Sequence, residues 1–392
     1  MFDDGDINDL EVTTMLISSR IVTIFMWLLL DWLVVDHIPT GDVAHFQVND
    51  LNNKPSFLQS FTAWDASHYL SIARYGYTSD QSYVFLPVFP FTMSLVRFVL
   101  HPFLSTFLSS EEMLVVSGLL LSNFAFVLSG LVLKRLCDHF NFSSISTRLS
   151  ILFFAFNPAS VFFSAIYTES LYSLFTFLGV YFHERAQLGL SSISLLTASG
   201  IRSNGWMNVI AVLFHAFLQG KSCYFFQYVP AISSILPFLC WNIMTYEWIM
   251  AEDLGSVSAL SPFVYGYLQE KYWGVGFMKQ YQLRQFPNFL IALPTIYFVY
   301  TYVLNTSTRD GENFSFCLRY RYHLVGVVIL VLVFAHVQIM ARVVFSSCPI
   351  VYLCLPPHFT GKLWNNLKFC VCYFVVFFIS GIALHCNNYP WT

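Results

Sequence analysis

Long apolar blocks alternate with short polar segments along most of the chain. The first block, residues 21–38, comes close to the roughly 20 apolar residues that one helix needs to cross a bilayer. Further apolar blocks occupy residues 86–107, 114–133, 149–182, 190–219, 224–250, 288–304, 322–345 and 366–385. This pattern predicts an all-α polytopic membrane protein with about nine to eleven membrane helices.

Two of the blocks carry polar interruptions. Pro158 and the pair Thr168-Glu169 divide the block 149–182, which predicts two short helices in place of one span. The segment Gly200-Ile201-Arg202-Ser203-Asn204-Gly205-Trp206 lies inside the block 190–219 and indicates a broken or re-entrant helix. Irregular backbone at membrane depth is tolerated only where it lines protein or water.

The first polar segment, residues 39–84, is predicted to be a loop outside the membrane. Arg20 precedes the first span and no lysine or arginine follows until Lys54, which favours a cytoplasmic N-terminus and a luminal or external loop. Within this loop a three-to-four-residue spacing predicts an interfacial helix over 61–74. The residues with that spacing are Phe61, Trp64, His68 and Ile72.

The charge pattern and the number of spans disagree over the segment 137–147. Lys134, Arg135 and Arg148 flank it, so the positive-inside rule places it in the cytoplasm. Counting spans from a luminal 39–84 loop places it in the lumen. Either one of the intervening blocks is re-entrant, or the charge rule fails here.

Composition supports the membrane class. Of the 392 residues, 56% are hydrophobic and only 10% are charged, against about 25% charged in a soluble domain. The net charge of −3 gives no nucleic-acid footprint, and the nine cysteines form no CxxC pair and no zinc-type spacing. The N-terminus is acidic, unlike a cleavable signal peptide, so we expect the first span to be a retained anchor.

The loop motif Ala63-Trp64-Asp65-Ala66-Ser67-His68-Tyr69 is the leading candidate for chemistry. Asp65 suits a general base toward a substrate hydroxyl, a role that contributes about 10²–10⁴ in rate, but a helix cap or a solvated acid would look the same. His68, one helical turn further on, could orient Asp65 or bind an anion, and Trp64 suits an interfacial anchor. Arg74 could pair with a phosphate or anchor the helix at the interface.

Two charged residues and one loop are further candidates. Glu169 would cost about 2.5–3.5 kcal/mol inside the membrane on insertion scales, so it is a functional candidate unless it ends a short helix at the surface. Arg202 can bind phosphate oxygens in a bidentate manner, or it can lie in a cytoplasmic turn. The amphipathic loop 251–287, with Lys271 and Tyr272, could cover a lipid-linked substrate or lie at the interface.

Taken in order, these motifs resemble those of the PIG-V family, GPI mannosyltransferase II. The motifs that carry the resemblance are Trp64-Asp65-x-x-His68-Tyr69-x-x-Ile72-Ala73, Phe85-x-Pro87-x-Phe89-Pro90, Phe156-Asn157-Pro158-Ala159-Ser160, Tyr167-Thr168-Glu169-Ser170, Gly200-Ile201-Arg202-Ser203-Asn204-Gly205, Lys271-Tyr272-Trp273-Gly274-Val275-Gly276-Phe277 and Pro287-Asn288-Phe289. Each motif alone is weak, and the ordered set, from about residue 20 to 352, is specific. Two departures are a reduced acidic element, Asp80-Gln81-Ser82-Tyr83, and a short 305–316 stretch.

The resemblance implies a GT-C architecture in a single integral membrane domain, residues 1–392, in the endoplasmic reticulum membrane with a luminal active site. It implies a dolichyl-phosphate-mannose donor and a GPI-anchor precursor that receives the second, α1,6-linked mannose by inverting transfer. We expect no cofactor besides the donor and no metal dependence, because the sequence contains no metal-binding cluster. Asp65 would be the base, Arg202 or Arg74 would hold the donor phosphate, and His68 would assist. The expected substrate-binding residues are Trp64, His68, Arg74, Asp80, Gln81, Glu169, Arg202, Asn204, Lys271 and Tyr272. An accessory subunit of the endoplasmic reticulum is a further candidate partner.

Three alternatives stay open on the sequence. A related lipid-phosphate-sugar transferase would use another acceptor. A transporter or scramblase for lipid-linked sugars would need polar residues at the bilayer midplane, of which Asp31 is one. A non-catalytic subunit would tolerate replacement of Asp65. The sequons at Asn141, Asn305 and Asn313 bear on topology, because only luminal sites are glycosylated.

Overall fold

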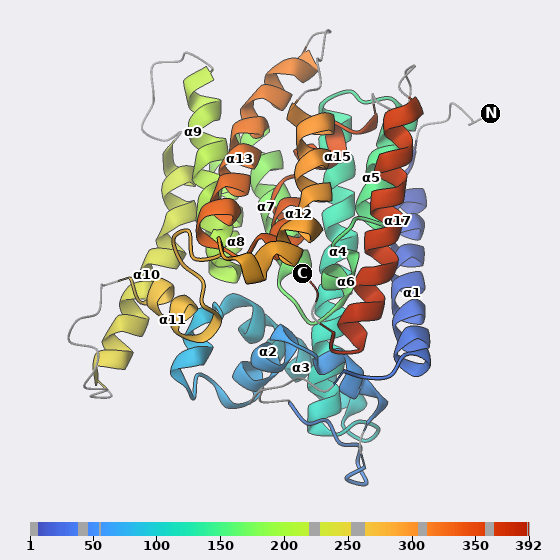
Figure 1. Cartoon of the computed structure of the whole chain (residues 1–392), viewed down its shortest axis with the longest axis vertical. Coiled ribbons are helices and arrows are strands. Elements are labelled where there is room, and N and C mark those ends of the chain that lie inside the picture. The colour runs from blue at the N-terminus through green and yellow to red at the C-terminus, as the bar shows by residue number, and fades with distance from the viewer. Residues whose placement is uncertain are drawn as a thin grey trace.

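The computed structural model describes residues 7–37, 46–54, 56–218, 228–251, 263–304, 312–356, 364–389 and 391. Over these residues the chain forms helices and no β-strand (Figure 1). The α-helices are α1 (Asp9–Leu33), α2 (Asp65–Tyr75), α3 (Val88–Leu104), α4 (Ser110–His139), α5 (Ser144–Ala155), α6 (Ser160–Ser164), α7 (Glu169–Glu184), α8 (Leu188–Ile201), α9 (Asn208–Leu218), α10 (Val229–Ala251), α11 (Val264–Trp273), α12 (Phe286–Phe298), α13 (Glu312–Phe334), α14 (Met340–Ser347), α15 (Ile350–Leu353) and α17 (Trp364–Cys386). The short 3-10 helices are η1 (Phe57–Thr62), η2 (Asp80–Val84), η3 (Ser203–Met207), η6 (Leu283–Gln285) and η8 (Val337–Ile339), and η7 (Val299–Leu304) is a π-helix.

The helices confirm the predicted all-α polytopic class. Five segments of the described chain are long and apolar enough to cross a membrane: Asp9–Leu33, Ser110–His139, Val229–Ile249, Leu283–Leu304 and Lys368–Cys386. Shorter apolar helices accompany them, among them α3, α5 and α8. The total of about nine to eleven membrane helices stays a prediction.

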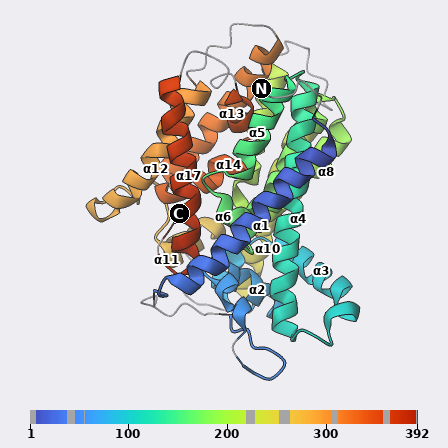
Figure 2. The same ribbon diagram turned by 90° about the vertical axis from the view of Figure 1, so that its right-hand side faces the viewer.

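Helix α4 connects two opposite faces of the molecule. At its start, Ser109 donates to the backbone carbonyl of Asn49 (2.6 Å), and Glu112 accepts from Ser56 (2.7 Å). Near its end, Lys134 pairs with Asp9 (3.2 Å) at the start of α1. We call these sides the loop face and the N-terminal face, and Figure 2 shows α4 running between them.

Helix α3 stays on the loop face. Ser94 donates to the backbone carbonyl of Ala73 in α2 (3.1 Å), and Arg97 donates to Ser110 at the start of α4 (2.6 Å). Figure 2 shows α3 beside that end of α4, away from the main bundle. The block 86–107 is therefore not a span, so the start of α1 and the segment 137–147 lie on the same face. A block that does not cross removes the disagreement between the charge rule and the counting of spans, because both then place the start of α1 and the segment 137–147 on one face.

The expectation that Arg20 flanks the first span is wrong. Helix α1 runs from Asp9 to Leu33, and Arg20 lies near its middle with only 3% of its surface exposed. Its guanidinium donates to the backbone carbonyls of Ala155 (2.6 Å) and Ser160 (3.1 Å), and it lies over the Phe126 ring at 3.8 Å. Ala155 ends α5 and Ser160 begins α6, so a buried cation donates to backbone carbonyls on both sides of the break between the two helices.

Several central helices are too short to cross. Helices α7 and α8 have 16 and 14 residues, which corresponds to roughly 21–24 Å at 1.5 Å per residue, against a hydrocarbon core of about 30 Å. The break predicted in 190–219 is present as η3 between α8 and α9. The block 149–182 is also broken, but the structure has three helices there, α5, α6 and α7, in place of the two predicted, because the chain breaks both at Pro158 and before Glu169. In Figure 1 the lower ends of α7, α8, α12 and α13 stop above a layer that contains α2 and α11. The broken backbone therefore meets the polar loop inside the molecule.

Candidate active site

Asp65 is the first residue of α2, next to a strained backbone position. Trp64 has φ 59° and ψ −130°, a conformation that costs a non-glycine residue of order 1–3 kcal/mol and persists only where its surroundings impose it. The predicted continuous helix 61–74 is therefore wrong at this point, since η1 ends at Thr62 and α2 begins at Asp65. The turn directs the backbone N–H of Asp65 to the Tyr167 hydroxyl (3.2 Å). Trp64 holds the cap position, so Asp65 is not the helix cap.

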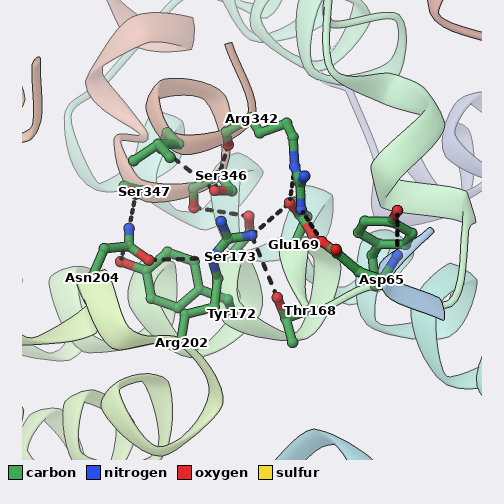
Figure 3. Close-up of polar contacts among 12 residues, drawn as sticks. Asp65, Thr168, Glu169, Tyr172, Ser173, Arg202, Asn204, Arg342, Ser346 and Ser347 are labelled. Atoms are coloured by element: carbon green, nitrogen blue, oxygen red, sulfur yellow. Dashed lines mark hydrogen bonds and ion pairs between the residues drawn. The ribbon is translucent and has the colours of Figure 1, made fainter. Parts of the chain in front are cut away.

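Glu169 is the first residue of α7 and is completely buried. One carboxylate oxygen contacts two arginines, Arg202 Nη1 at 2.5 Å and Arg342 Nε at 2.8 Å (Figure 3). A fully buried carboxylate needs such partners, because an unpaired one would lose its hydration without compensation. The alternative that Glu169 ends a helix at the surface is excluded.

Arg342, in α14, connects this buried carboxylate to the polar loop. Its Nη2 lies 3.2 Å from Oδ2 of Asp65, while its Nε contacts Glu169. Its guanidinium carbon lies over the rings of Phe162 (4.4 Å) and Tyr167 (4.9 Å). Arg342 was not among the residues predicted from the sequence, although a charged residue inside the apolar block 322–345 is the same signal that singled out Glu169.

Arg202 lies in the break between α8 and η3. Its Nε donates to Asn204 Oδ1 (3.2 Å), its Nη1 lies 3.4 Å from the Thr168 hydroxyl, and its side chain is only 12% exposed. Asn204 in turn donates to the Ser347 hydroxyl (3.0 Å). These contacts exclude an exposed cytoplasmic turn and show why the segment is broken: its polar groups bind those of α7 and α14.

Gly205 allows this break to pack closely. A Cβ at this position would lie 2.6 Å from Cα and 2.8 Å from the backbone nitrogen of Ser199 in α8. Backbone atoms cannot move aside as a flexible side chain can, so only glycine fits. The turn that carries Arg202 and Asn204 is therefore held against the end of α8.

The four charged groups form one row, Asp65–Arg342–Glu169–Arg202, with two negative and two positive charges. Within the described part of the chain, Nη1 of Arg342 and Nη2 of Arg202 have no hydrogen-bond partner, and Oε2 of Glu169 has none either. The row therefore offers guanidinium donors for an anion beside a carboxylate base. Guanidinium groups match the geometry of phosphate oxygens.

His68 lies beside this row in an aromatic surrounding. Its ring stacks on Phe85 with centroids 4.7 Å apart and meets Trp273 edge-on at 6.3 Å. Burial lowers the pKa of His68 below its usual value, against the opposite effect of the Asp65 charge. The imidazole is therefore neutral near pH 7, which favours hydrogen bonding over the binding of an anion as a cation.

Asp80, Gln81, Lys271 and Tyr272 form a second cluster that joins η2 to α11. Lys271 Nζ contacts Asp80 at 2.6 Å, the Tyr272 hydroxyl donates to the same carboxylate, and the backbone N–H of Gln81 donates to it at 2.9 Å. Burial raises the pKa of Asp80, but the hydrogen bonds from Lys271 and Tyr272 outweigh it and hold the pKa below its usual value. This cluster fastens the amphipathic helix α11 over the loop layer.

Arg74 lies away from Asp65. It pairs with Glu111 (2.6 Å) and contacts the Ser110 hydroxyl, both at the start of α4. It sits in the last turn of α2, about 13 Å along the helix from Asp65 at 1.5 Å per residue. Of the two basic residues expected to hold a phosphate, the structure brings only Arg202 to the row.

The described residues contain no group of three or more histidine, cysteine, aspartate or glutamate side chains that could hold a metal ion. The positive charge beside Asp65 comes from arginines.

A family model described as "Mannosyltransferase (PIG-V)" matches residues 9–392. Among curated proteins, "GPI alpha-1,6-mannosyltransferase 2" of Cricetulus griseus is 26% identical, with 97% of this chain and 98% of that protein covered. The human protein of the same name is also 26% identical, with the same coverage. "GPI mannosyltransferase 2" of Drosophila melanogaster is 24% identical, with 97% and 99% covered.

Among solved structures, the archaeal oligosaccharyltransferase AglB from Archaeoglobus fulgidus, in complex with an inhibitory peptide and a dolichol-phosphate, has a TM-score of 0.47 and 10% identity. The superposition covers 97% of this chain and 56% of that one.

Proposed function

The chain belongs to the mannosyltransferase (PIG-V) family and is a glycosyltransferase, and from that premise we propose that it adds the second, α1,6-linked mannose to a GPI-anchor precursor. The names of relatives that match over nearly their whole length support this acceptor and linkage. The observation that carries the proposal is the row Asp65–Arg342–Glu169–Arg202, which places a carboxylate and two guanidinium groups together at the ends of short membrane helices.

Asp65 acts as the general base. Its side chain is 35% exposed, so an acceptor hydroxyl can reach it from the loop side, while its contact with Arg342 limits its orientation. In the transfer, the acceptor oxygen attacks the anomeric carbon as its proton passes to Asp65, and the bond from that carbon to the donor phosphate oxygen breaks. One displacement on a β-linked donor gives an α-linked product, so a single base suffices.

Arg202 holds the phosphate of dolichyl-phosphate-mannose. The leaving phosphate takes the electron pair of the broken bond, and a fixed cation stabilises that developing charge. Nη2 of Arg202 is available for this contact, because Glu169, Thr168 and Asn204 engage the other two nitrogens. We do not assign this role to Arg74, because Arg74 already pairs with Glu111.

We propose no metal and no cofactor besides the donor lipid, because the arginines supply the positive charge that a metal ion would otherwise provide. The check is transfer activity after treatment with EDTA. Full activity is expected, and a loss that Mn²⁺ or Mg²⁺ restores would refute this part of the proposal.

The loop face, with Asp65, is assigned to the lumen of the endoplasmic reticulum. Lys134, Arg135 and Arg148 lie toward the N-terminal face, where the positive-inside rule favours the cytoplasm. Asp9 and Glu11, which pair with them, do not cancel the rule, since acidic residues contribute little to it.

The experiment is complementation of cells that lack the second GPI mannosyltransferase, with wild type and Asp65→Asn, read as surface GPI-anchored protein and lipid intermediates. We expect rescue by wild type and failure of well-expressed Asp65→Asn. Rescue by both would remove Asp65 from catalysis, and rescue by neither would favour a related transferase with another acceptor or a transporter.

A further inference from the structure

Arg342 contacts Asp65 and Glu169 through two different nitrogens of one guanidinium group. We propose that Arg342 is a positioning residue for the base Asp65, and that Glu169 and Arg202 hold Arg342 in the orientation this requires. The inference rests on the proposed transfer reaction, in which Asp65 takes the acceptor proton.

The orientation of Arg342 is fixed on three sides. Its Nε contacts the buried Glu169 at 2.8 Å, and its guanidinium carbon lies over the rings of Phe162 and Tyr167. A guanidinium is planar and its donors diverge at fixed angles. Once Nε and the faces of the group are held, the direction of Nη2 toward Asp65 follows.

Asp65 itself has few other restraints. Its side chain is partly exposed, and within the described part of the chain its carboxylate accepts a hydrogen bond only from Arg342. Its backbone N–H donates to the hydroxyl of Tyr167, whose ring also lies against Arg342. Arg342 and Tyr167 together therefore fix both the backbone and the carboxylate of the base.

Glu169 holds Arg342 in place from the side opposite Asp65, and Glu169 is itself held by Arg202. It pairs with Arg202 at 2.5 Å, and Arg202 is held by Asn204. Loss of Arg342 leaves the Glu169–Arg202 pair intact and leaves Asp65 in partial contact with solvent. No charge would then be both buried and unpaired, so we expect an Arg342→Gln variant to fold.

The test measures kcat and the donor KM separately in detergent-solubilised membranes from cells lacking the second GPI mannosyltransferase, with dolichyl-phosphate-mannose and the mannosylated GPI precursor. For Arg342→Gln we expect kcat to fall about 100-fold, the scale on which a misplacement of about 1 Å acts, with the donor KM changed by less than about threefold. Arg342→Lys keeps the charge but not the planar fork, so its kcat should fall by about tenfold or more. The matched control is Arg185→Gln, at the far end of α7, where Arg185 contacts Tyr181 at an exposed position.

A double variant separates positioning from other roles. If Arg342 acts through Asp65, Asp65→Asn with Arg342→Gln should be no slower than Asp65→Asn alone, because effects of groups that act as a unit are not additive. A multiplicative loss in the double variant would overturn the proposal. So would a donor KM that rises tenfold with kcat unchanged, which would make Arg342 a phosphate ligand, or an Arg342→Gln variant with the wild-type kcat.

The activity of the wild type distinguishes a failure of the proposed function from a failure of the inference about Arg342. Wild type without mannose transfer contradicts the proposed function, whereas active wild type with an unaffected Arg342→Gln contradicts only this inference. If Arg342→Gln does not elute from size-exclusion chromatography as a folded protein, the kcat of Arg342→Lys becomes the test, because this variant keeps the charge balance of the row. A wild-type kcat in Arg342→Lys would then overturn the proposal.

Discussion

Replacing Glu169 with glutamine removes the negative charge that lies between two arginines. Glu169 is fully buried, and Arg202 and Arg342 are 12% and 13% exposed, so neither cation can recover its hydration without a rearrangement. Removing one partner of a buried ion pair costs about 3–5 kcal/mol. The row changes from neutral to a net charge of +1, and the two guanidinium groups face each other without a carboxylate.

The assay is thermal unfolding of the purified enzyme in detergent, with mannose transfer measured in parallel. The matched control is Glu111→Gln, which also breaks a glutamate–arginine pair, but one in which both side chains are 26% exposed. A pair of that kind is worth about 0–1 kcal/mol. We expect Glu169→Gln to lower the unfolding temperature by several degrees more than the control, and to abolish transfer.

A second substitution tests the electrostatic reason. Adding Arg202→Gln to Glu169→Gln restores a neutral row, with Asp65 and Arg342 as the remaining pair, so part of the lost stability should return. The double variant should stay inactive, because the proposed phosphate ligand is gone. The reasoning is refuted if Glu169→Gln is no less stable than Glu111→Gln, or if the double variant is less stable than Glu169→Gln alone.

Three further predictions concern other parts of the chain. Burial raises the pKa of Asp80, but the hydrogen bonds from Lys271 and Tyr272 lower it by more, so its pKa in the folded protein lies below the usual value. The stability that the Asp80 carboxylate contributes is therefore present above about pH 4, and it is lost as the pH falls through the pKa of the folded protein. Hydrogen exchange of α11 should therefore be constant from pH 8 to 5 after correction for the intrinsic rate, and an opening already at pH 6 would contradict this. Arg20→Met removes the guanidinium that donates to the carbonyls of Ala155 and Ser160 and leaves Ala155, within the described residues, only the longer hydrogen bond from the Ser160 hydroxyl (3.4 Å). A lost buried hydrogen bond costs about 1–3 kcal/mol, so the unfolding temperature should fall; an unchanged value would count against it. Asn141 lies at the N-terminal face, so Asn141→Gln should not change the mobility of the protein on a gel, whereas a glycan at Asn141 would overturn the assigned orientation.

Hydropathy along the chain was enough for the fold class and for the two breaks. Membrane helices are set by local apolar content, and a glutamate or an arginine in an apolar run is visible without neighbours. The same local reasoning singled out Asp65, Glu169 and Arg202, which the structure brings into one row. It also singled out Lys271 and Tyr272, but in a predicted loop; the structure places them in helix α11 and joins them to Asp80.

Local reasoning failed where a contact between distant segments decides the outcome. Arg20 looks like a residue that flanks a span until α5 and α6 supply carbonyls for it inside the bundle. The block 86–107 is apolar enough to suggest a span, yet its contacts with α2 and the start of α4 keep it on the loop face. Hydropathy cannot separate a helix that crosses from one that lies against a neighbour, because both bury apolar surface.

The sequence by itself determined that this is a helical membrane protein with an acidic motif in a polar loop and charges in broken helices. Only the tertiary structure decided that Arg342, 277 residues after Asp65 in the chain, binds both that base and Glu169. The physical reason is that a charged residue in an apolar block indicates a buried partner of opposite charge, because burying a charge alone is costly. Which partner it finds depends on which helices end at the same depth in the bundle, and that is a property of packing between segments far apart in sequence.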